Sequence, residues 1–261
     1  ILVERKFGTG GEKSPLDLRD HKWEDVGMGL APFDWNKGYD VEKDLNFTIK
    51  TKNQGTSLSC GGQAGGYLGE SVEMADTKTY EQRSAKFIYS QIFQSTGGAY
   101  MRDIFKIALG QGFAEETLCP SYENNKAPSE AFMTRPQDIS AQARENALQT
   151  IGKGYANVDP TDINAISQAS EVNHGVIILA GGKNNGTWLT KFPQFANDIG
   201  WKHFLYCGKK GLIDGKKYIG VKNSWGDTVG ENGWQWLSED FFVGGAVIEA
   251  RTIYLDRKSV V

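Results

Sequence analysis

Cysteine and histidine are scarce in this sequence, and their scarcity excludes two classes of protein. Each occurs only three times in 261 residues. Three cysteines (Cys60, Cys119 and Cys207) cannot build a disulfide framework, and at least one of them must stay free. No Cys-x-x-Cys pair occurs, so we expect no structural zinc site, no other metal and no cofactor. Cysteine usage does not decide the cellular compartment, for which a secreted or otherwise extracytoplasmic location is the working expectation.

A basic excess and long hydrophobic runs are also missing. Lysine and arginine number 29 against 32 aspartates and glutamates, so the net charge is −3 and nucleic acid is not expected as a partner. No stretch approaches the roughly 20 apolar residues that a membrane-spanning helix needs. The chain starts at Ile1 without an initiator methionine or a signal peptide, so we interpret it as a processed or incomplete form.

Helical periodicity is typical of the front half of the chain. From Cys60 onward, apolar residues recur at intervals of three and four, which predicts an amphipathic helix. Residues 84–93 predict a short second helix, and residues 101–109 predict a third one that stops at Gly110 and Gly112. Residues 54–112 are therefore expected to be mainly helical.

The back half has a different pattern. Three prolines in the polar residues 119–137 indicate a connecting segment, and two short helices are predicted at 141–151 and 160–169. Short apolar or β-branched runs between glycine turns predict strands at 176–180, 204–207, 218–221 and 246–250.

A helical front half and a β-rich back half predict an α+β protein with two lobes. We place an extended N-terminal arm at residues 1–40, a mainly helical lobe at 41–130 and a β-rich lobe at 131–261. The arm is expected to lie over the surface of the domain, anchored by Trp23, Phe33 and Trp35.

Cys60 is the strongest candidate for chemistry. It follows a loop of small and hydroxylated residues that starts at Gln54, and it opens the predicted helix. A thiol at a helix N-terminus feels the positive end of the helix dipole, which favours the nucleophilic thiolate. A single free cysteine in a helix is nevertheless more often buried and inert, so the chemical interpretation needs partner residues.

Two residues far along the chain have the properties of such partners. His203 lies at the start of a predicted strand, and Asn223 lies where the next strand runs into a turn. An imidazole can share the proton of a thiol, and an asparagine side chain can hold that imidazole in one tautomer. His203 and Asn223 follow Cys60 by roughly 140 and 160 residues.

The sequence around these residues resembles the papain (C1-type) family of cysteine peptidases. Lys222-Asn223-Ser224-Trp225-Gly226, followed by Gly230-Glu231-Asn232-Gly233-Trp234, is similar to the family's Asn-Ser-Trp-Gly…Gly-x-x-Gly-Tyr signature. Gln54-Gly55 with Ser59-Cys60 resembles its nucleophile loop, and Gly97-Gly98 its substrate-binding glycine pair. Residues 17–20, 84–89 and 119–122 resemble segments of the bacterial and phage branch. The resemblance covers roughly residues 15–255.

The resemblance implies a fold with a helical left lobe, a β-barrel-like right lobe and an active site in the cleft between them. It implies that the Cys60 thiolate attacks the scissile carbonyl, that His203 is its imidazolium partner, and that Asn223 orients His203. Trp225 would shield that hydrogen bond, and the Gln54 amide and the Cys60 N–H would form the oxyanion hole. The residues expected to bind substrate are Gly97, Gly98, Tyr100, Trp201, Lys202 and Trp225.

Four positions depart from the family pattern. Gly61 stands where an aromatic residue usually follows the nucleophile, and Ser57 stands where papain has a disulfide cysteine. Val229 replaces a second tryptophan, and Lys202 precedes the histidine where papain has an aspartate. Because of Gly61 and Lys202, the resemblance does not predict which residues form one wall of the cleft or what charge the cleft carries.

The function expected from the sequence is a cysteine endopeptidase that acts through an acyl-enzyme on a polypeptide substrate, with a propeptide or a protein inhibitor as a further partner class. One alternative is a catalytically silent papain-fold protein that binds or has a structural role. Another is a different thiol acyltransferase or amidase, which would not be expected to carry the Asn-Ser-Trp-Gly motif.

Overall fold

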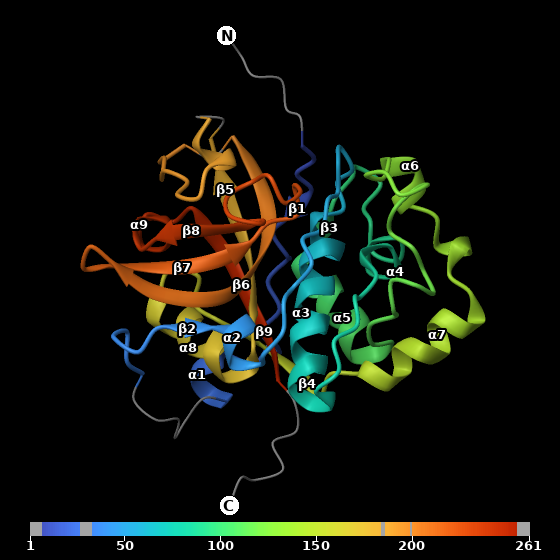
Figure 1. Ribbon diagram of the computed structural model, residues 1–261, viewed down its shortest axis with the longest axis horizontal. Coiled ribbons are helices and arrows are strands. Elements are labelled where there is room, and N and C mark those ends of the chain that lie inside the picture. Colours follow the sequence, from blue (N-terminus) through green and yellow to red (C-terminus); the bar gives the residue numbers. More distant parts are fainter. Residues whose placement is uncertain (1–6, 27–32, 184–185, 199, 255–261) are drawn as a thin grey trace, which may run out of the picture.

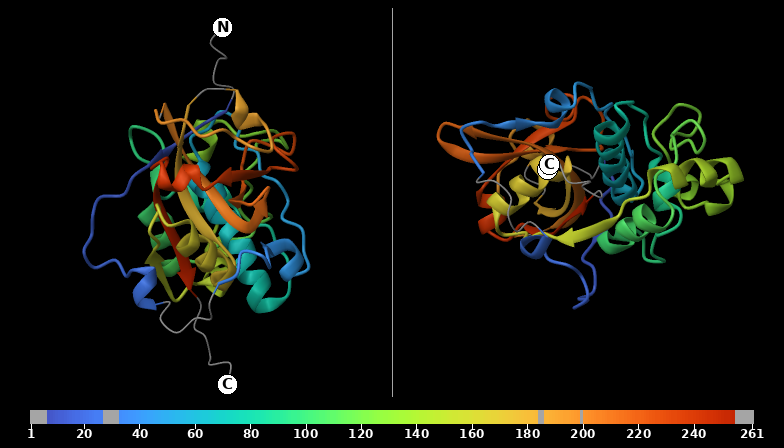
Figure 2. Two further views of the ribbon diagram at one scale, coloured as in Figure 1. Left: turned by 90° about the vertical axis from the view of Figure 1, so that its left-hand side faces the viewer. Right: turned by 90° about the horizontal axis from the view of Figure 1, so that it is seen from below.

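The structure is a computed structural model that describes residues 7–26, 33–183, 186–198 and 200–254. One side is built mainly of helices and the other of a twisted sheet with further helices beside it, and helix α3 (Cys60–Thr77) lies along the junction (Figure 1). The view from below in Figure 2 shows the same two bodies side by side. The two-lobe α+β architecture expected from the sequence is therefore confirmed.

The helices lie mostly where the sequence predicts them. The predicted helices after Cys60 and at 84–93, 101–109, 141–151 and 160–169 correspond to α3, α4, α5, α7 and α8, although α4 and α7 are shorter than expected. Besides α3, the helices are α1 (Trp23–Val26), α2 (Val41–Asp44), α4 (Ala85–Tyr89), α5 (Met101–Gly110), α6 (Glu130–Met133), α7 (Ala141–Ala147), α8 (Ile163–Asn173) and α9 (Asp240–Val243). Short 3₁₀ turns occur at Pro136–Asp138, Leu148–Thr150 and Thr187–Leu189.

The four predicted strands are part of a larger set. They correspond to β5, β6, β7 and β9, whereas β8 and the four short strands were not predicted. The strands are β1 (Gly11–Glu12), β2 (Tyr39–Asp40), β3 (Ala99–Tyr100), β4 (Gly154–Asn157), β5 (Val176–Gly182), β6 (Trp201–Ile213), β7 (Lys216–Lys222), β8 (Trp234–Ser238) and β9 (Val247–Tyr254).

The main sheet is open, which corrects the expectation of a β-barrel-like lobe. Its seven strands follow the order β4-β9-β5-β6-β7-β8, with β2 paired to β6. All pairs in this sheet are antiparallel. Within the described residues no pairing joins β4 to β8, and closure of a barrel requires its two edge strands to pair.

Helix α3 is buried on nearly every side, which explains its glycine-rich sequence. Of its 18 residues, 14 are buried. A Cβ on Gly62 would overlap the backbone carbonyl of Ala85, so glycine lets α4 pack directly against the helix. One hydrophobic cluster joins α3, α4 and α5 to the inner face of β5 and β6, and a second covers the outer face of the sheet under α8.

A buried ion pair ties α3 to the segment that leads into the cysteine loop. Lys52 Nζ lies 2.5 Å from Glu70 Oε1, and both side chains are at most 2% exposed. The same ammonium donates to the carbonyl of Arg83, and Glu70 accepts from the Arg83 N–H and the Tyr80 hydroxyl. The Lys52 ammonium and the Glu70 carboxylate thus both have hydrogen bonds besides their own contact, which is the condition under which a buried ion pair is tolerated.

Glu70→Gln should lower the free energy of unfolding by about 3–5 kcal/mol, because it leaves the Lys52 ammonium buried without a countercharge. Urea denaturation measures the change. The exposed pair Lys106–Asp103 supplies the control, since Asp103→Asn should change stability by at most about 0.5 kcal/mol. Equal losses in the two variants would contradict the role given to the buried pair.

Candidate active site

The loop before Cys60 is fixed by its own side chains and by the opposite lobe. Ser57 donates its hydroxyl to the Gln54 carbonyl at 2.7 Å, and the Gln54 amide Nε2 donates to the Ser57 carbonyl at 2.8 Å. The Gln54 N–H reaches across to the Ser224 carbonyl at 2.9 Å. Cys60 then opens α3 and is fully buried. Ser57, which stands in place of a disulfide cysteine, therefore stabilises the loop through hydrogen bonds.

His203 and Asn223 lie on neighbouring strands and meet within the lobe. His203 is in β6, Asn223 follows the end of β7, and Nε2 lies 2.9 Å from Asn223 Oδ1. The Asn223 amide donates to Gln235 Oε1 at 2.8 Å, which directs its carbonyl oxygen toward the imidazole. With Nε2 protonated, Nδ1 is left as the basic nitrogen. It is buried and has no hydrogen-bond partner among the described residues.

Trp225 covers this pair. Its ring centroid is 4.6 Å from that of His203, with the planes tilted by 32°. Trp225 also packs against Trp201, which in turn contacts Trp188. Trp201 is thus part of a buried aromatic cluster, whereas it was expected to bind substrate.

A peptide segment of the chain itself occupies the site. We call residues 7–12 the strap, and Figure 1 shows it running beside β3 where the two lobes meet. The Gly8 carbonyl accepts from Gln54 Nε2 at 3.2 Å and from Trp225 Nε1 at 3.1 Å. The Gly10 N–H donates to Cys60 Sγ at 3.3 Å. Part of the predicted N-terminal arm therefore passes between the lobes.

The strap also pairs with the edge of the helical lobe. β1 lies parallel to β3, and the Ala99 N–H donates to the Gly10 carbonyl at 2.9 Å. In the glycine pair expected to bind substrate, the Gly98 N–H and carbonyl bond to Tyr89 and Gln94 within its own lobe. Gly98 also leaves room for the strap, since a Cβ there would overlap the Gly10 carbonyl.

Two other expected substrate-binding residues contact the end of the strap. Lys202 Nζ forms an ion pair with Glu12 Oε2 at 2.7 Å, and Tyr100 is paired with Glu12 in the β1–β3 register. At the other end, the Phe7 ring stacks on Trp225 with centroids 5.4 Å apart. Four of the six expected substrate-binding residues thus lie along the strap, namely Gly98, Tyr100, Lys202 and Trp225, whereas Gly97 lies against the Leu58 side chain.

Asp20 holds the arm beyond the strap in place. Its carboxylate accepts from Arg102 and Arg251 at 2.8 and 2.9 Å and from the Tyr155 hydroxyl at 2.6 Å. Burial alone would raise the pKa of Asp20, but the hydrogen bonds from Arg102 and Tyr155 and the charge of Arg251 outweigh it and lower the pKa to about 2. This anchor therefore stays charged down to strongly acidic pH.

With the strap in place, the candidate nucleophile and base are both neutral at pH 7. Burial raises the pKa of the Cys60 thiol to about 11, although the N–H groups of Phe204 and Gly10 favour the thiolate. Burial likewise lowers the pKa of His203 to about 4, against the opposing effect of its hydrogen bond to Asn223. No hydrogen bond joins Cys60 to His203 within the described part of the chain.

The other two cysteines do not take part in the site. Cys119 and Cys207 are free, buried thiols, and burial raises the pKa of each. Among the described residues no group of histidine, cysteine and acidic side chains could hold a metal ion, and no helix is long and apolar enough to cross a membrane.

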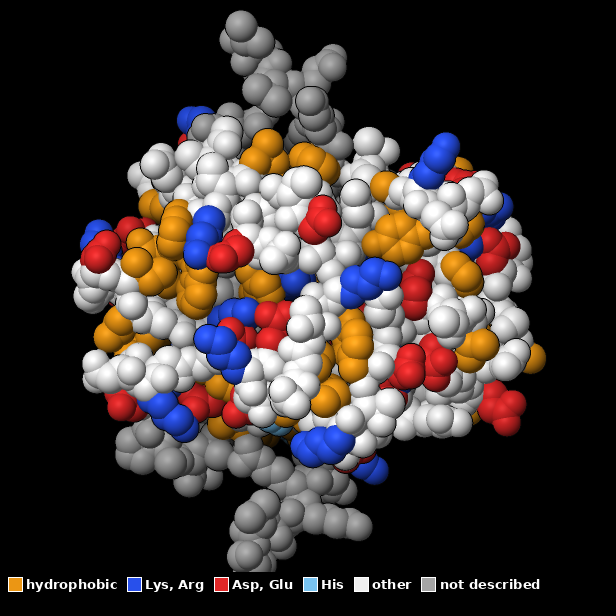
Figure 3. Space-filling view, in the orientation of Figure 1, with side chains coloured by type: hydrophobic (Ala, Val, Ile, Leu, Met, Phe, Trp, Pro, Cys, Tyr) orange, Lys and Arg blue, Asp and Glu red, His pale blue; other side chains and the backbone are white. Residues whose placement is uncertain are grey.

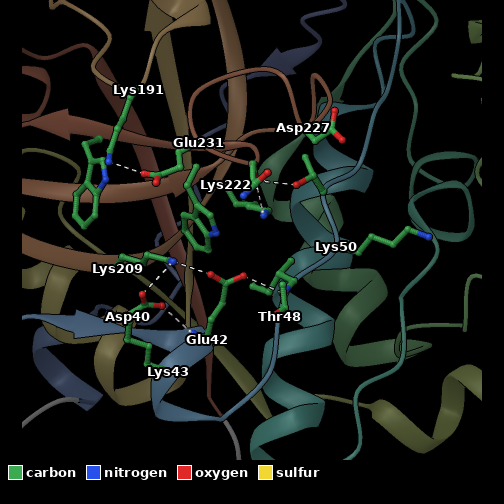
Figure 4. A pocket seen from close by; sticks show the side chains of 15 residues that line it. Asp40, Glu42, Lys43, Thr48, Lys50, Lys191, Lys209, Lys222, Asp227 and Glu231 are labelled. Carbon is green, nitrogen blue, oxygen red and sulfur yellow. Dashed lines mark hydrogen bonds and ion pairs between the residues drawn. The ribbon is translucent and has the colours of Figure 1, made fainter.

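A pocket of about 640 Å³ lies apart from this site, next to α2, β7 and β8 (Figure 4). Its charged side chains largely compensate one another, with Lys209 between Asp40 and Glu42 and Lys191 paired to Glu231. Cationic and anionic side chains are intermingled over the whole face shown in Figure 3. The pocket is lined by five lysines and four acidic residues, so it offers a ligand almost no excess of one charge.

Several contributors to the site were not predicted. Gln235 fixes Asn223, and Ser224 donates its hydroxyl to Gln54 Oε1 at 2.6 Å. Glu130 accepts from the Leu58 N–H at 2.6 Å and from the Tyr89 hydroxyl at 2.6 Å, which holds the cysteine loop against α4 and α6. Ser224 lies inside the recognised motif, but neither Gln235 nor Glu130 has a sequence signal beyond being polar.

Comparisons with solved structures identify the fold. Xylellain, a cysteine protease from Xylella fastidiosa, is 20% identical, with 97% of each chain covered and a TM-score of 0.76. Digestive procathepsin L 3 from the larval midgut of Tenebrio molitor is 16% identical, with 96% of this chain and 76% of that chain covered and a TM-score of 0.70. The bromelain protease of Ananas comosus in complex with the E64 inhibitor is 20% identical, with 84% of this chain and 99% of that chain covered and a TM-score of 0.63.

No protein-family model and no curated protein sequence matches the chain. At these identities the likeness shows the fold alone. The chain has the two-lobe fold of papain-like cysteine proteases.

Proposed function

We propose that this protein is a cysteine endopeptidase with Cys60 as nucleophile, His203 as its proton partner and Asn223 as the residue that orients His203. The observation that carries the proposal is the position of the strap. The Gly8 carbonyl accepts a hydrogen bond from the Gln54 amide, and the Gly10 N–H donates one to Cys60 Sγ. A polypeptide backbone therefore already contacts the groups that would act on a substrate.

The proposed reaction has two steps. The Cys60 thiolate attacks the scissile carbonyl carbon, the oxyanion accepts from Gln54 Nε2 and the Cys60 N–H, and the C–N bond breaks as His203 gives its proton to the leaving amine. Water then attacks the thioester carbonyl carbon while His203 takes up one of its protons, and the C–S bond breaks, which releases the acid product and restores the thiolate–imidazolium pair. Asn223 keeps Nε2 bonded, so that Nδ1 carries the transferred proton.

The proposal includes a latent state in which the strap blocks the site. The strap covers Sγ and excludes water, and exclusion of water is what makes thiol and imidazole neutral. Once the strap leaves, water reaches both groups and their pKa values move toward a thiolate–imidazolium pair. The likeness to procathepsin L 3, a proform, supports a role for the N-terminal segment as a propeptide.

The finer family assignment is also part of the proposal. The likeness to xylellain over nearly the whole of both chains supports a place in the bacterial and phage branch. A catalytically silent papain-fold protein is the second candidate, favoured by the neutral, covered Cys60.

Labelling with E-64 separates the two candidates. E-64 should add one equivalent to the chain at Cys60 and nowhere else, and the label should be absent from Cys60→Ala but present in Cys119→Ala. Mass spectrometry measures the labelling. A chain that never takes up label, even when the strap is displaced, is the silent protein.

His203→Ala should lower turnover by about 100- to 10,000-fold because it removes the proton partner. Peptide hydrolysis measures this effect.

Gly10→Ala should displace the strap and raise the rate at which Cys60 is alkylated. The added Cβ would overlap the Leu58 carbonyl, and the catalytic residues are untouched. Gly110→Ala is the matched control, because a Cβ at Gly110 meets no atom within 4 Å.

The pH dependence of the same alkylation tests the latent state. In the native chain the rate with iodoacetamide should rise about tenfold per pH unit between pH 6 and 9, because the thiol has a raised pKa and only its thiolate reacts. In Gly10→Ala the midpoint of the profile should shift to lower pH. Identical profiles in the two chains would contradict the proposed role of the strap.

A further inference from the structure

The pocket beside α2, β7 and β8 contains a buried lysine without a countercharge. Lys222 lines it from the end of β7 and is only 2% exposed, and Figure 4 shows its side chain in the middle of the lining residues. Its ammonium donates to the Asn232 carbonyl at 2.8 Å. None of the carboxylates in the described part of the chain lies within ion-pair distance of Lys222 Nζ. An ammonium has three donors, so this one can bind a further acceptor.

The acidic residues nearest to this lysine are engaged elsewhere. Glu42 attracts Lys222 at longer range, but its Oε2 lies 2.6 Å from Lys209 Nζ and its Oε1 accepts from the Ile49 N–H at 2.9 Å. Asp40 also pairs with Lys209, at 3.1 Å. The nearly equal numbers of lysines and acids in the pocket therefore do not compensate the Lys222 ammonium locally.

The unpaired charge does not benefit the fold. Burial lowers the pKa of Lys222 to about 8 with a further contribution from Lys209, against the attraction of Glu42. The side chain is therefore still largely protonated at pH 7. Apolar side chains in place of buried charges usually leave a protein equally stable or more stable. A buried cation of this kind in a pocket is typical of a functional site.

Two tryptophans form an apolar wall of the same pocket. Trp234 and Trp236 are two residues apart on β8, so their side chains leave the same face of the strand, and both line the pocket. Lys222 Nζ lies 5.2 Å from the centroid of the Trp234 ring. A flat apolar group can therefore pack on this wall while a polar group attached to it reaches the ammonium.

The charges of the pocket favour a ligand group with a single negative charge. Four acidic side chains line the pocket, and they would repel a second negative charge beside Lys222. Lys43 and Lys50 also line it, but both are exposed, so solvent screens their charges. A carboxylate carries one charge and accepts hydrogen bonds on both oxygens. The volume of about 640 Å³ is within the usual range for small-molecule sites.

We propose that this pocket binds a ligand with one carboxylate next to an aromatic or other apolar group. The carboxylate pairs with Lys222, and the apolar group packs on Trp234 and Trp236. Neither Cys60 nor His203 lines the pocket, so the site is separate from the proposed peptidase chemistry and does not rest on it.

Isothermal titration calorimetry at pH 7 with three probes tests the ligand class. Phenylacetate has the proposed chemistry, phenylacetamide has the same shape without the charge, and inorganic phosphate is an anion without the apolar group. Phenylacetate should bind in a 1:1 ratio and at least about tenfold more tightly than either of the others, the scale of a hydrogen bond to a charged group. Absence of phenylacetate binding, or equal or tighter binding of another probe, would overturn the proposal.

Lys222→Met tests the role of the ammonium. Phenylacetate should bind at least about tenfold more weakly to this variant, whereas its urea midpoint should stay the same or rise because an unpaired buried charge is removed. Lys216→Met is the matched control, since Lys216 is an exposed lysine of the same strand outside the pocket. Unchanged binding in Lys222→Met, a lower urea midpoint, or an equal loss of binding in the control contradicts the assignment.

Trp236→Ala tests the apolar wall. In the native chain phenylacetate should bind more tightly than acetate, and this preference should be lost in the variant because the ring has no surface to pack on. A preference that survives the substitution places the apolar group elsewhere and refutes this arrangement of the ligand.

Two peptides identify the source of the carboxylate, because a peptide C-terminus has the same chemistry as a free acid. Gly-Gly-Phe with a free C-terminus should bind more tightly than its C-terminal amide, and comparison with phenylacetate shows which source the pocket prefers. Equal binding of the free and the amidated peptide, with no binding of phenylacetate, excludes both sources.

Cys60→Ala separates this inference from the peptidase function. The variant lacks the proposed nucleophile, yet it should bind phenylacetate as tightly as the native chain. E-64 labelling of the native chain tests the peptidase function on its own, so either proposal can fail while the other stands. Loss of phenylacetate binding in Cys60→Ala would show that the ligand occupies the cleft at Cys60, and the proposed site would be wrong.

Discussion

The candidate site depends on the joint where residues 52–54 of one lobe bond to residues 223–226 of the other. The Gln54 N–H donates to the Ser224 carbonyl, the Ser224 hydroxyl donates to the Gln54 side chain, and the Gly226 N–H donates to the Lys52 carbonyl. Tyr67 adds a further connection, because its hydroxyl donates to the Asn223 carbonyl and accepts from the Lys52 N–H. These short bonds fix the cysteine loop relative to the strand that positions His203, although the two segments are far apart in sequence.

The joint between residues 52–54 and 223–226 depends on the packing of the core beneath it. The Lys52 backbone bonds to Gly226, in the turn after β7, and to Tyr67 of α3, while its side chain is buried against Glu70 of the same helix. The glycines of α3 allow this helix, which carries both Cys60 and Glu70, to pack closely on α4. The stability of the buried ion pair and the geometry of the site are therefore linked through the first three turns of α3. A loss of the pair would loosen the loop that holds Gln54 before it loosened the sheet.

The candidate site residues could be recognised in the sequence more readily than their surroundings. Cys60, His203 and Asn223 are recognisable because their chemistry requires particular side chains at positions set by local elements, and the structure brings His203 and Asn223 into contact. Gln235 and Glu130 act through contacts in the folded chain, and no motif or spacing in the sequence indicates these contacts. The path of the strap was missed for a similar reason, since a run of glycines has no periodicity and its place in the cleft depends on walls from both lobes. The barrel was expected by resemblance, but closure depends on pairing between edge strands rather than on any residue type.

Gly61 shows how a substitution in one segment is compensated by another. The aromatic residue expected after the nucleophile is absent, yet its space is filled by Phe204, the neighbour of His203, and by Ile104 from α5. Phe204, the residue after His203, thus forms the part of the wall that the residue after Cys60 was expected to form. Because Phe204 comes from the sheet side, it also lies against the peptide backbone at Gly11, where a ring at position 61 would project from the helix instead. The same exchange that closes the wall therefore narrows the cleft, and it connects the departure at Gly61 to the three glycines of the strap.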